Sequence, residues 1–409
     1  MSLPAKLSMR GLYKVFGPAP EEAVELARQG SDKDEIYRRT GSVVAVNDVN
    51  LDVAAREIFV VMGLSGSGKS TLVRCINRLI EPTSGQLLID GQDVLQADEE
   101  GLRQLRLKKV SMVFQHFALF PHRTVAENAA YGLKVRGVGA AERRAKAVEA
   151  LEAVGLGAWA DTLPANLSGG MQQRVGLARA LAVDPEILLM DEPFSALDPL
   201  IRRDMQNELL ALKERYAATI VFITHDLHEA LTLGNRIAIM RDGAFMQVGP
   251  PEEIVGAPAD DYVANFTKEV DRSRVLTLGR IARRDRPLLA PAEGAAAACR
   301  KLKAAEVQGL LVADSNGKPL GSVSAAGLLM ADPAARVEDV MERPALTGER
   351  DTPLAAVLEA GALGAPVALL DNQGRIDASV DSGDLLAALA AARSEARPDP
   401  SAQMEASHG

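Results

Sequence analysis

The chain has 409 residues, of which 47% are hydrophobic and 25% charged, and its formal net charge is −9. This length is typical of two domains, and the acidic balance argues against a general binder of nucleic acid or of an anionic membrane. Two cysteines make no disulfide framework, which favours reduced thiols in a cytosolic protein. No signal peptide and no run of about 18 apolar residues is visible, so we expect any membrane role to come through a partner.

The first segments in chain order are a strand, expected over residues 9–16, and a charged helical stretch at residues 18–41. Residues 20–29 predict a helix that ends at Gly30. Residues 31–34 (SDKD) resemble a capping box that opens a second short helix, which we expect to stop before Gly41. The stretch at 18–41 is either a solvated helical insertion or a surface for a partner or sensor, and the sequence leaves both open.

A phosphate-binding sequence follows two expected strands, at residues 43–53 and 57–62. Residues 63–70 read GLSGSGKS and match G-x-x-x-x-G-K-[ST], the pattern of a loop whose backbone N–H groups cradle phosphates, and residues 69–78 predict the helix that this motif requires. Lys69 is placed to reach the β- and γ-phosphates, and Ser70 to ligate Mg²⁺. The predicted ATP-binding residues of this segment are Gly63, Leu64, Ser65, Gly66, Ser67, Gly68, Lys69, Ser70 and Thr71.

Strand-like and helical segments alternate through the rest of this half, which indicates an α/β fold. Residues 124–154 have a helical pattern that opens with TVAE, a capping box. Asp242-Gly243 predicts a tight hairpin between two strands. The expected short strands are residues 86–89, 110–114, 187–190, 220–224 and 236–240.

Two acidic residues follow the expected strand at residues 187–190. Asp191 fits a carboxylate that holds Mg²⁺, and Glu192 fits the base for an attacking water; a helix N-cap is the alternative for this pair. Upstream, residues 168–170 (SGG) open an expected helix, whose free N–H groups form an anion site.

Residues 167–173 (LSGGMQQ) and 187–192 (ILLMDE) resemble the signature and Walker B segments of ATP-binding-cassette (ABC) proteins. Six segments of that family occur here in its order, and the resemblance covers residues 9–266. It implies an ABC-type P-loop ATPase domain, with a RecA-like core and a helical subdomain, that uses ATP and Mg²⁺. The site residues that it implies are Lys69, Gln115, Glu192 and His225 for catalysis, Ser70, Gln115 and Asp191 for Mg²⁺, and Asp198 for the D-loop.

Individual roles also rest on this resemblance. Gln115 resembles the Q-loop glutamine, a ligand of Mg²⁺ and water at the hinge to the helical subdomain. His225 resembles the switch histidine that contacts the γ-phosphate. In the family an aromatic residue near the first strand stacks on adenine; Phe16 stands at that place, Tyr13 is its rival, and a core aromatic is the alternative.

The resemblance further implies a dimer. In the family the signature of one subunit faces the γ-phosphate of the ATP bound to the other, and the D-loop crosses the interface. Because this chain has one P-loop and one signature, a second copy of itself is the expected partner. The signature residues concerned are Ser168, Gly169, Gly170 and Gln172.

Beyond about residue 273 the sequence becomes rich in alanine and contains an internal repeat. Residues 311–317 (LVADSNG) match residues 368–374 (ALLDNQG), with a period of 57 residues from Asp314 to Asp371. Each unit predicts helix, strand, turn, strand and helix, and the pair resembles tandem CBS (cystathionine-β-synthase-type) modules. Asp384 stands where ligand-binding modules place an aspartate that holds a ribose, whereas Asp381 replaces a hydroxyl and would repel a phosphate. Structural dimerisation, nucleotide or cyclic-dinucleotide sensing, and ionic-strength sensing all remain open.

Four segments resemble in sequence the ATP-binding subunit of glycine betaine/proline betaine importers: residues 12–17, 36–41, 58–81 and 190–206. That resemblance implies a peripheral protein on the cytoplasmic face of the inner or plasma membrane. Its partners would be a transmembrane permease, docked beside Gln115 and residues 117–122, and through the permease a periplasmic or lipid-anchored binding protein, with no nucleic acid. We expect an ATPase domain at residues 1–272, CBS modules at 273–393 and a disordered tail at 394–409.

Other functions stay open at this point. An importer for choline, carnitine or an amino acid is the nearest alternative. A soluble ABC ATPase of DNA repair or translation is another class, but such proteins usually carry two cassettes or a DNA-binding insertion, and neither is seen. A CBS-based regulator with a vestigial ATPase is disfavoured, because every catalytic position is filled.

Overall fold

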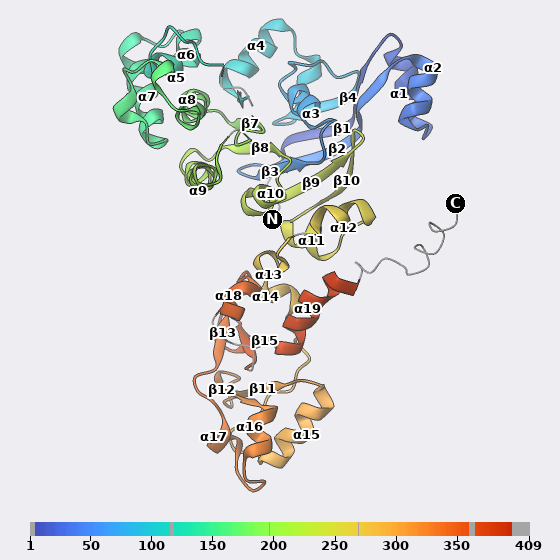
Figure 1. Cartoon of the computed structure of the whole chain (residues 1–409), viewed down its shortest axis with the longest axis vertical. Coiled ribbons are helices and arrows are strands. Elements are labelled where there is room, and N and C mark those ends of the chain that lie inside the picture. Colours follow the sequence, from blue (N-terminus) through green and yellow to red (C-terminus); the bar gives the residue numbers. More distant parts are fainter. Residues whose placement is uncertain (1–4, 115–117, 196, 269, 360–364, 395–409) are drawn as a thin grey trace, which may run out of the picture. The chain divides into compact units, whose positions relative to one another are not determined.

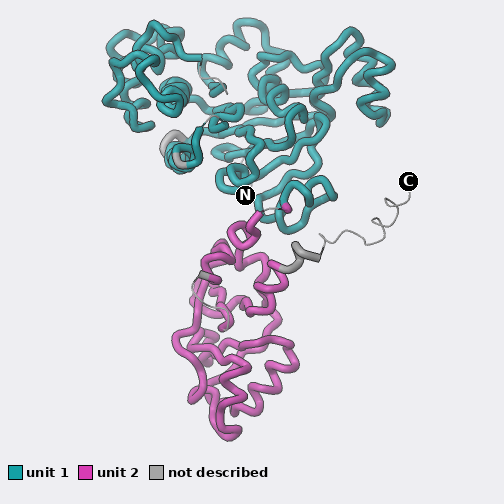
Figure 2. Tube along the Cα trace, viewed as in Figure 1, with its two compact units in different colours: residues 1–267 teal, residues 268–409 magenta. Residues whose placement is uncertain are grey.

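The computed structural model describes residues 5–114, 118–195, 197–268, 270–359 and 365–394. The chain forms two compact units, Met1–Thr267 and Lys268–Gly409, which Figure 2 shows in different colours. Among the described residues, no helix is long and apolar enough to cross a membrane.

The centre of the first unit is a six-stranded sheet in the order β10-β9-β3-β8-β7-β6, parallel except for the β10–β9 pair (Figure 1). Every residue of β3, β7 and β8 is buried. Continuous apolar strands of this kind are covered on both faces, which confirms the expected α/β class. The strands are β3 (Ile58–Met62), β6 (Val110–Val113), β7 (Ile187–Asp191), β8 (Thr219–Thr224), β9 (Arg236–Arg241) and β10 (Ala244–Gly249).

A second, antiparallel sheet has the order β2-β1-β4-β5. Its apolar residues share one core with α3 (Lys69–Ile76) and with the central sheet. Helix α3 is thus fixed by packing, and so is the loop before it. The strands are β1 (Ala5–Phe16), β2 (Val43–Ala54), β4 (Ser84–Ile89) and β5 (Gln92–Asp93).

A helical region follows β6, as the sequence predicted. Thr124 and Glu127 form the expected capping box at the start of α5, and the helical pattern up to residue 154 divides into three helices. A single core joins this region to the central sheet. The helices before β9 are α4 (Glu99–Lys108), α5 (Val125–Ala129), α6 (Tyr131–Val135), α7 (Ala140–Ala153), α8 (Gly169–Leu181), α9 (Pro199–Tyr216) and α10 (Leu227–Leu233), with short 3₁₀ turns at Val94–Gln96, Gly157–Trp159 and Pro164–Asn166.

The charged stretch at residues 18–41 forms two helices, α1 (Pro20–Arg28) and α2 (Lys33–Thr40). The predicted capping box at residues 31–34 is wrong in detail. Asp32 caps α2 by itself, with its carboxylate accepting a hydrogen bond from Glu35 N at 2.7 Å. Gly41 ends the helix in the left-handed conformation, which suits a residue without a Cβ.

The unit ends with the predicted hairpin and two helices. Asp242 and Gly243 both have positive φ between β9 and β10, as a tight turn of this type requires. Helices α11 (Pro251–Gly256) and α12 (Asp261–Thr267) then complete the unit.

The second unit contains two small sheets, β11-β12 and β13-β14-β15, each with its own apolar core. The order α15-β11-β12-α16 recurs as α18-β14-β15-α19, so the sequence repeat is also a structural repeat. The assignment of this repeat to CBS modules stays a prediction. Of the tail expected at 394–409, Ser394 is the last residue of α19, and residues 395–409 lie outside the described residues. The elements are α13 (Arg272–Val275), α14 (Leu278–Ile281), α15 (Ala295–Ala305), β11 (Gly309–Ala313), β12 (Pro319–Ser324), α16 (Ala325–Met330), α17 (Val337–Val340), β13 (Leu346–Gly348), α18 (Leu354–Glu359), β14 (Val367–Leu370), β15 (Ile376–Val380) and α19 (Ser382–Ser394).

Candidate active site

The P-loop joins β3 to α3 and is held tightly on both sides. Gly63 and Gly68 have positive φ, and a Cβ at either position would overlap a carbonyl oxygen, that of Met240 or of Ala45 respectively. Only glycine therefore fits at these two positions without moving β9 or β2. The buried hydroxyl of Ser67 has no hydrogen-bond partner in the structure, which is consistent with a loop shaped for a bound group.

Lys69 lies at the start of α3 and turns back over this loop. Its Nζ donates to the carbonyl oxygens of Gly63 at 2.8 Å and Leu64 at 3.0 Å. Burial lowers the pKa of Lys69, and the nearby carboxylates of Glu192 and Asp191 partly offset that effect. The ammonium group is thus held beside the loop backbone, where it can pair with a phosphate.

Ser70, in the first turn of α3, lies in contact with Asp191, the last residue of β7. Ser70 Oγ donates to Asp191 Oδ1 at 2.8 Å, and Arg74 Nη2 lies 3.2 Å from Asp191 Oδ2. Hydroxyl and carboxylate oxygens are ligands that Mg²⁺ prefers. Among the residues that the structure describes, no group of three or more His, Cys, Asp or Glu side chains could hold a metal. This donor set suits Mg²⁺, which commonly binds through one or two protein groups and the substrate's phosphates.

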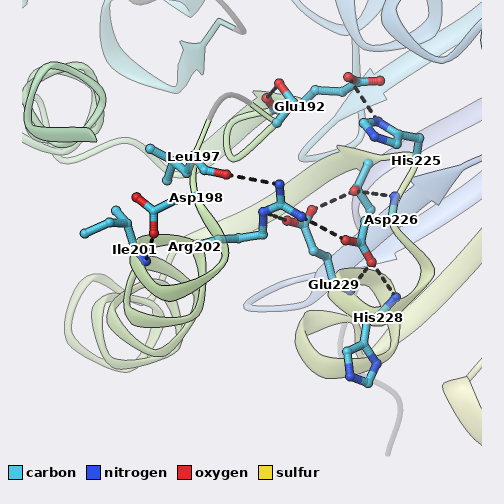
Figure 3. Close-up of polar contacts among 11 residues, drawn as sticks. Glu192, Leu197, Asp198, Ile201, Arg202, His225, Asp226, His228 and Glu229 are labelled. Carbon is cyan, nitrogen blue, oxygen red and sulfur yellow. Dashed lines mark hydrogen bonds and ion pairs between the residues drawn. The ribbon is translucent and has the colours of Figure 1, made fainter. Parts of the chain in front are cut away.

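Glu192 and His225 face each other beyond Asp191. Glu192 has a positive φ of 47° and its backbone N–H donates to Ile223 O at 3.1 Å. His225 Nδ1 lies 3.2 Å from Glu192 Oε2, and the histidine side chain is largely exposed (Figure 3). A left-handed conformation at a glutamate costs free energy, and such residues gather at functional sites. The geometry leaves an accessible carboxylate paired with an imidazole.

The structure places the predicted D-loop residue Asp198 at the start of α9, and it adds Arg202, Asp226 and Glu229, which the sequence analysis did not single out. Asp198 caps α9, with Oδ1 accepting from Ile201 N at 3.1 Å. Arg202, one turn into α9, reaches Asp226 and Glu229 at the start of α10. Asp226 could have been found as the N-cap after the strand, but no sequence signal marks Arg202 or Glu229.

The signature residues lie at the start of α8, away from α3 in Figure 1. Ser168 is the N-cap and accepts a hydrogen bond from Met171 N at 3.3 Å. Ser168 and Gly169 are exposed, so backbone N–H groups of the first turn are available to an anion from outside. Gln172 turns inward and donates to the carbonyl oxygens of Pro164 and Leu167, which fixes the loop before the helix.

Phe16 and Tyr13 differ sharply in exposure. The Tyr13 side chain is 5% exposed and belongs to the small core beneath α1 and α2, whereas Phe16, at the end of β1, is 44% exposed. Lys14 Nζ lies 4.8 Å from the centre of the Phe16 ring. Of the two rings, only that of Phe16 is open to stacking on a base. Gln115, the predicted Q-loop residue, lies outside the described residues.

Asp384, the predicted CBS ligand residue, lies in a cavity of about 820 Å³ in the second unit. Its carboxylate is engaged by two arginines, Arg286 at 2.7 Å and Arg283 at 3.5 Å, and it accepts a hydrogen bond from Asp381 N. Any ribose bound there would compete with these ion pairs. A ligand role for Asp384 therefore stays a prediction.

Comparisons with known proteins are consistent with this geometry. Residues 46–195 match the model of the ABC transporter family. The chain is 45% identical to the glycine betaine transport ATP-binding protein OpuAA of Bacillus subtilis, over 98% of each chain. It is 46% identical to the glycine betaine/proline betaine transport system ATP-binding protein ProV of Escherichia coli, over 94% of this chain and 97% of the relative. A solved dimeric ATP-binding cassette in a post-hydrolysis state, bound to ADP and Pi, is similar at 33% identity and a TM-score of 0.51, over 60% of this chain and 98% of that one.

Proposed function

The chain belongs to the ATP-binding subunits of glycine betaine ABC transporters, and from this premise we propose that it hydrolyses ATP to drive the import of glycine betaine and proline betaine. The observation that carries the proposal is the similarity to OpuAA over 98% of both chains. The P-loop and the Glu192–His225 pair supply the chemistry that such a subunit needs.

Binding of ATP is assigned to the P-loop and its neighbours. The loop's backbone N–H groups and the Lys69 ammonium hold the phosphates, helped by the N-terminus of α3. Ser70 and Asp191 would hold Mg²⁺, which offsets the negative charge of the phosphates when bound. Phe16 offers its exposed ring to adenine.

Hydrolysis is assigned to Glu192. Its carboxylate accepts a proton from the attacking water, because it is the accessible carboxylate next to Asp191 and the P-loop. His225, whose Nδ1 lies 3.2 Å from Glu192 Oε2, holds the carboxylate in place. Lys69 stabilises the negative charge that builds up on the transferred phosphoryl group.

Two copies of the chain would together form each complete ATP site. The signature on α8 lies away from the P-loop of its own chain in Figure 1, so it can serve the nucleotide of a second copy. The similar solved cassette is a dimer, which supports this arrangement. Asp198, at the start of α9, would lie in the interface.

Further partners follow from the same proposal. A transmembrane permease would dock beside Gln115 and residues 117–122, of which the structure describes residues 118–122. A binding protein, periplasmic or lipid-anchored, would deliver the solute to the permease from the other side of the membrane. The protein would act on the cytoplasmic face of the inner or plasma membrane. Carnitine is a second candidate solute, because the glycine betaine/carnitine transport ATP-binding protein GbuA of Listeria monocytogenes is 44% identical over 94% of this chain.

The proposal is tested by uptake of radiolabelled glycine betaine in salt-stressed cells that carry the native permease. Cells with the unaltered chain should accumulate the solute, and cells with Glu192→Gln should not, although the variant should still bind ATP. Glu99→Gln, at an exposed position of α4, is the matched control and should transport normally. Equal uptake of glycine betaine with the unaltered chain and with Glu192→Gln would redirect the search for the solute to choline, carnitine and amino acids. Unchanged ATP hydrolysis by Glu192→Gln would overturn the assignment of Glu192 as the base.

A further inference from the structure

One arginine connects the two loops that carry the hydrolytic pair. Arg202 lies four residues after Asp198, in the first turn of α9. Its Nη2 donates to the carbonyl oxygen of Leu197 at 3.2 Å, and its Nη1 donates to Asp226 Oδ2 at 3.1 Å (Figure 3). The guanidinium Nε lies 3.7 Å from Glu229 Oε1. A planar guanidinium can hold several partners in fixed directions, here two hydrogen-bond acceptors and the Glu229 carboxylate as an ion pair, which a lysine cannot do.

The segments that Arg202 joins are those of the proposed active site. Leu197 belongs to the segment that runs from Glu192 into α9, and Asp226 directly follows His225. Glu192 and His225 themselves are 3.2 Å apart. Arg202 therefore forms a second bridge between the same two segments, on the side away from the Glu192–His225 pair in Figure 3.

The two carboxylates paired with Arg202, those of Asp226 and Glu229, also fix the backbone on both sides of His225. Asp226 caps α10, with Oδ1 accepting from His228 N at 2.8 Å and from Glu229 N at 3.3 Å. Glu229 Oε2 accepts from Thr224 Oγ1 at 2.6 Å, and Thr224 Oγ1 in turn accepts from Asp226 N at 2.9 Å. His225 thus lies between two residues whose positions depend on this network.

Charge explains why the network needs a cation. Glu229 is 4% exposed, and burial raises the pKa of its carboxyl group, an effect to which neighbouring Asp226 adds. Thr224, Arg202 and Gln206 act in the opposite direction. Without the guanidinium, the buried Glu229 carboxylate would face that of the partly exposed Asp226 with no cation between them, and their repulsion would be relieved by movement of the loop.

We propose that Arg202 is a positioning residue for ATP hydrolysis, which holds the loop bearing His225 against the segment that follows Glu192. Arg202 acts through these loops and does not itself contact the hydrolytic pair. The inference rests on the proposed role of Glu192 and His225, and it adds a residue that determines their geometry. A displacement of about 1 Å at such a site can reduce turnover by about 100-fold.

The test compares Arg202→Gln with Arg203→Gln, an exposed neighbour on the same helix, in the full-length chain. Steady-state ATPase kinetics should give a kcat about 10- to 100-fold lower for Arg202→Gln, with KM for ATP within about two-fold. Arg203→Gln should match the unaltered chain. Arg202→Lys should be intermediate, because one ammonium keeps the charge but not the fork of donors.

A second substitution separates positioning from simple loss of structure. Glu229→Gln removes one of the two repelling charges and keeps the shape of the side chain, so the double variant with Arg202→Gln should regain several-fold in kcat over Arg202→Gln alone. Such recovery is a coupling that a double-mutant cycle measures. Thermal unfolding of each variant corrects the rates for the fraction of folded protein.

Three results would overturn the inference: a kcat for Arg202→Gln equal to that of Arg203→Gln, a kcat loss fully explained by unfolded protein, or no recovery in the double variant. Failure of the proposed function would look different. If the unaltered chain hydrolyses ATP but does not support glycine betaine uptake, the solute assignment fails and the role of Arg202 stands.

Discussion

Glu192 and Lys69 show how backbone conformation and burial prepare single residues for phosphate chemistry. Glu192 adopts its positive φ directly after the last residue of β7, so its side chain leaves the buried strand and stays accessible. Lys69 is 5% exposed and has carbonyl oxygens as its hydrogen-bond partners. The positive φ of Glu192 and the burial of the Lys69 charge would both be costly elsewhere, and for Lys69 a bound phosphate would offset that cost.

Replacement of Lys69 by alanine should weaken ATP binding strongly and abolish turnover. The lost hydrogen bonds to a charged group are worth about 1.5–3 kcal/mol, or roughly 10- to 150-fold in affinity. Equilibrium binding of a fluorescent ATP analogue would measure the loss, with Lys108→Ala, at an exposed site, as the control. Wild-type affinity in the Lys69 variant would mean that the loop backbone alone holds the nucleotide.

The two cysteines should differ in reactivity. Cys75 in α3 is fully buried, and burial raises the pKa of its thiol to about 12. Because the thiolate is the reactive form, N-ethylmaleimide at pH 8 should modify Cys299, which is partly exposed, and should modify Cys75 only after denaturation. Mass spectrometry of the native Cys299→Ser variant should find no label; rapid labelling of that variant would show that α3 opens in the native state.

At the scale of elements, the insertion formed by α1 and α2 is part of the packed structure. Ala23, Val24, Leu26 and Ile36 bury their side chains together with Tyr13, Val15 and Val44 from β1 and β2. The insertion therefore covers one end of the antiparallel sheet, close in sequence to Phe16. The alternatives of a solvated insertion and of a partner surface are still open, since one face of a helix can pack while the other binds.

Substitution of Ile36 should reveal how firmly the insertion is joined to the unit. Ile36 is 2% exposed, whereas its neighbour Tyr37 is 57% exposed. Ile36→Ala should cost about 2–5 kcal/mol of unfolding free energy, and Tyr37→Ala should change it by about 0.5 kcal/mol or less. Urea denaturation compares the two midpoints. Equal midpoints would indicate that the insertion unfolds independently of the sheet.

At the scale of the whole molecule, the chain divides after Thr267 into an ATPase unit and a repeat unit. Each unit has apolar cores of its own, and the cores of the second unit contain no residue of the first. A unit with its own core can fold alone. The residues proposed for hydrolysis therefore belong to a different unit from the repeat that resembles CBS modules.

Removal of residues 268–409 should leave basal ATP hydrolysis in place, because the P-loop, Glu192 and His225 all lie in the first unit. The response of hydrolysis to salt or added nucleotide should change if the second unit is regulatory. ATPase assays of both chains over a range of KCl concentrations would measure this. An identical response would move regulation elsewhere, with the charged insertion at residues 18–41 as the next candidate.

Sequence by itself determined the chemistry and the fold class of the first unit. The P-loop, the signature and the Asp191-Glu192 pair could be recognised because phosphate chemistry demands particular residue types at short, fixed spacings. The apolar runs that became β7 and β8 could be placed because strands buried on both faces are continuously apolar. Glycine, capping and turn signals were also local, which is why the capping box at Thr124 and the hairpin at Asp242-Gly243 were predicted correctly.

Only the tertiary structure decided which distant residues meet. Ser70 and Asp191 are 121 positions apart. Tyr13 is buried by an insertion whose apolar face could be read from the sequence but whose packing partner could not. Asp384 is paired with arginines from another segment. The same holds for Arg202, whose role depends on where α9 places it relative to the start of α10. Local sequence patterns encode secondary structure and short motifs, whereas contacts of this kind depend on how complete elements pack against one another.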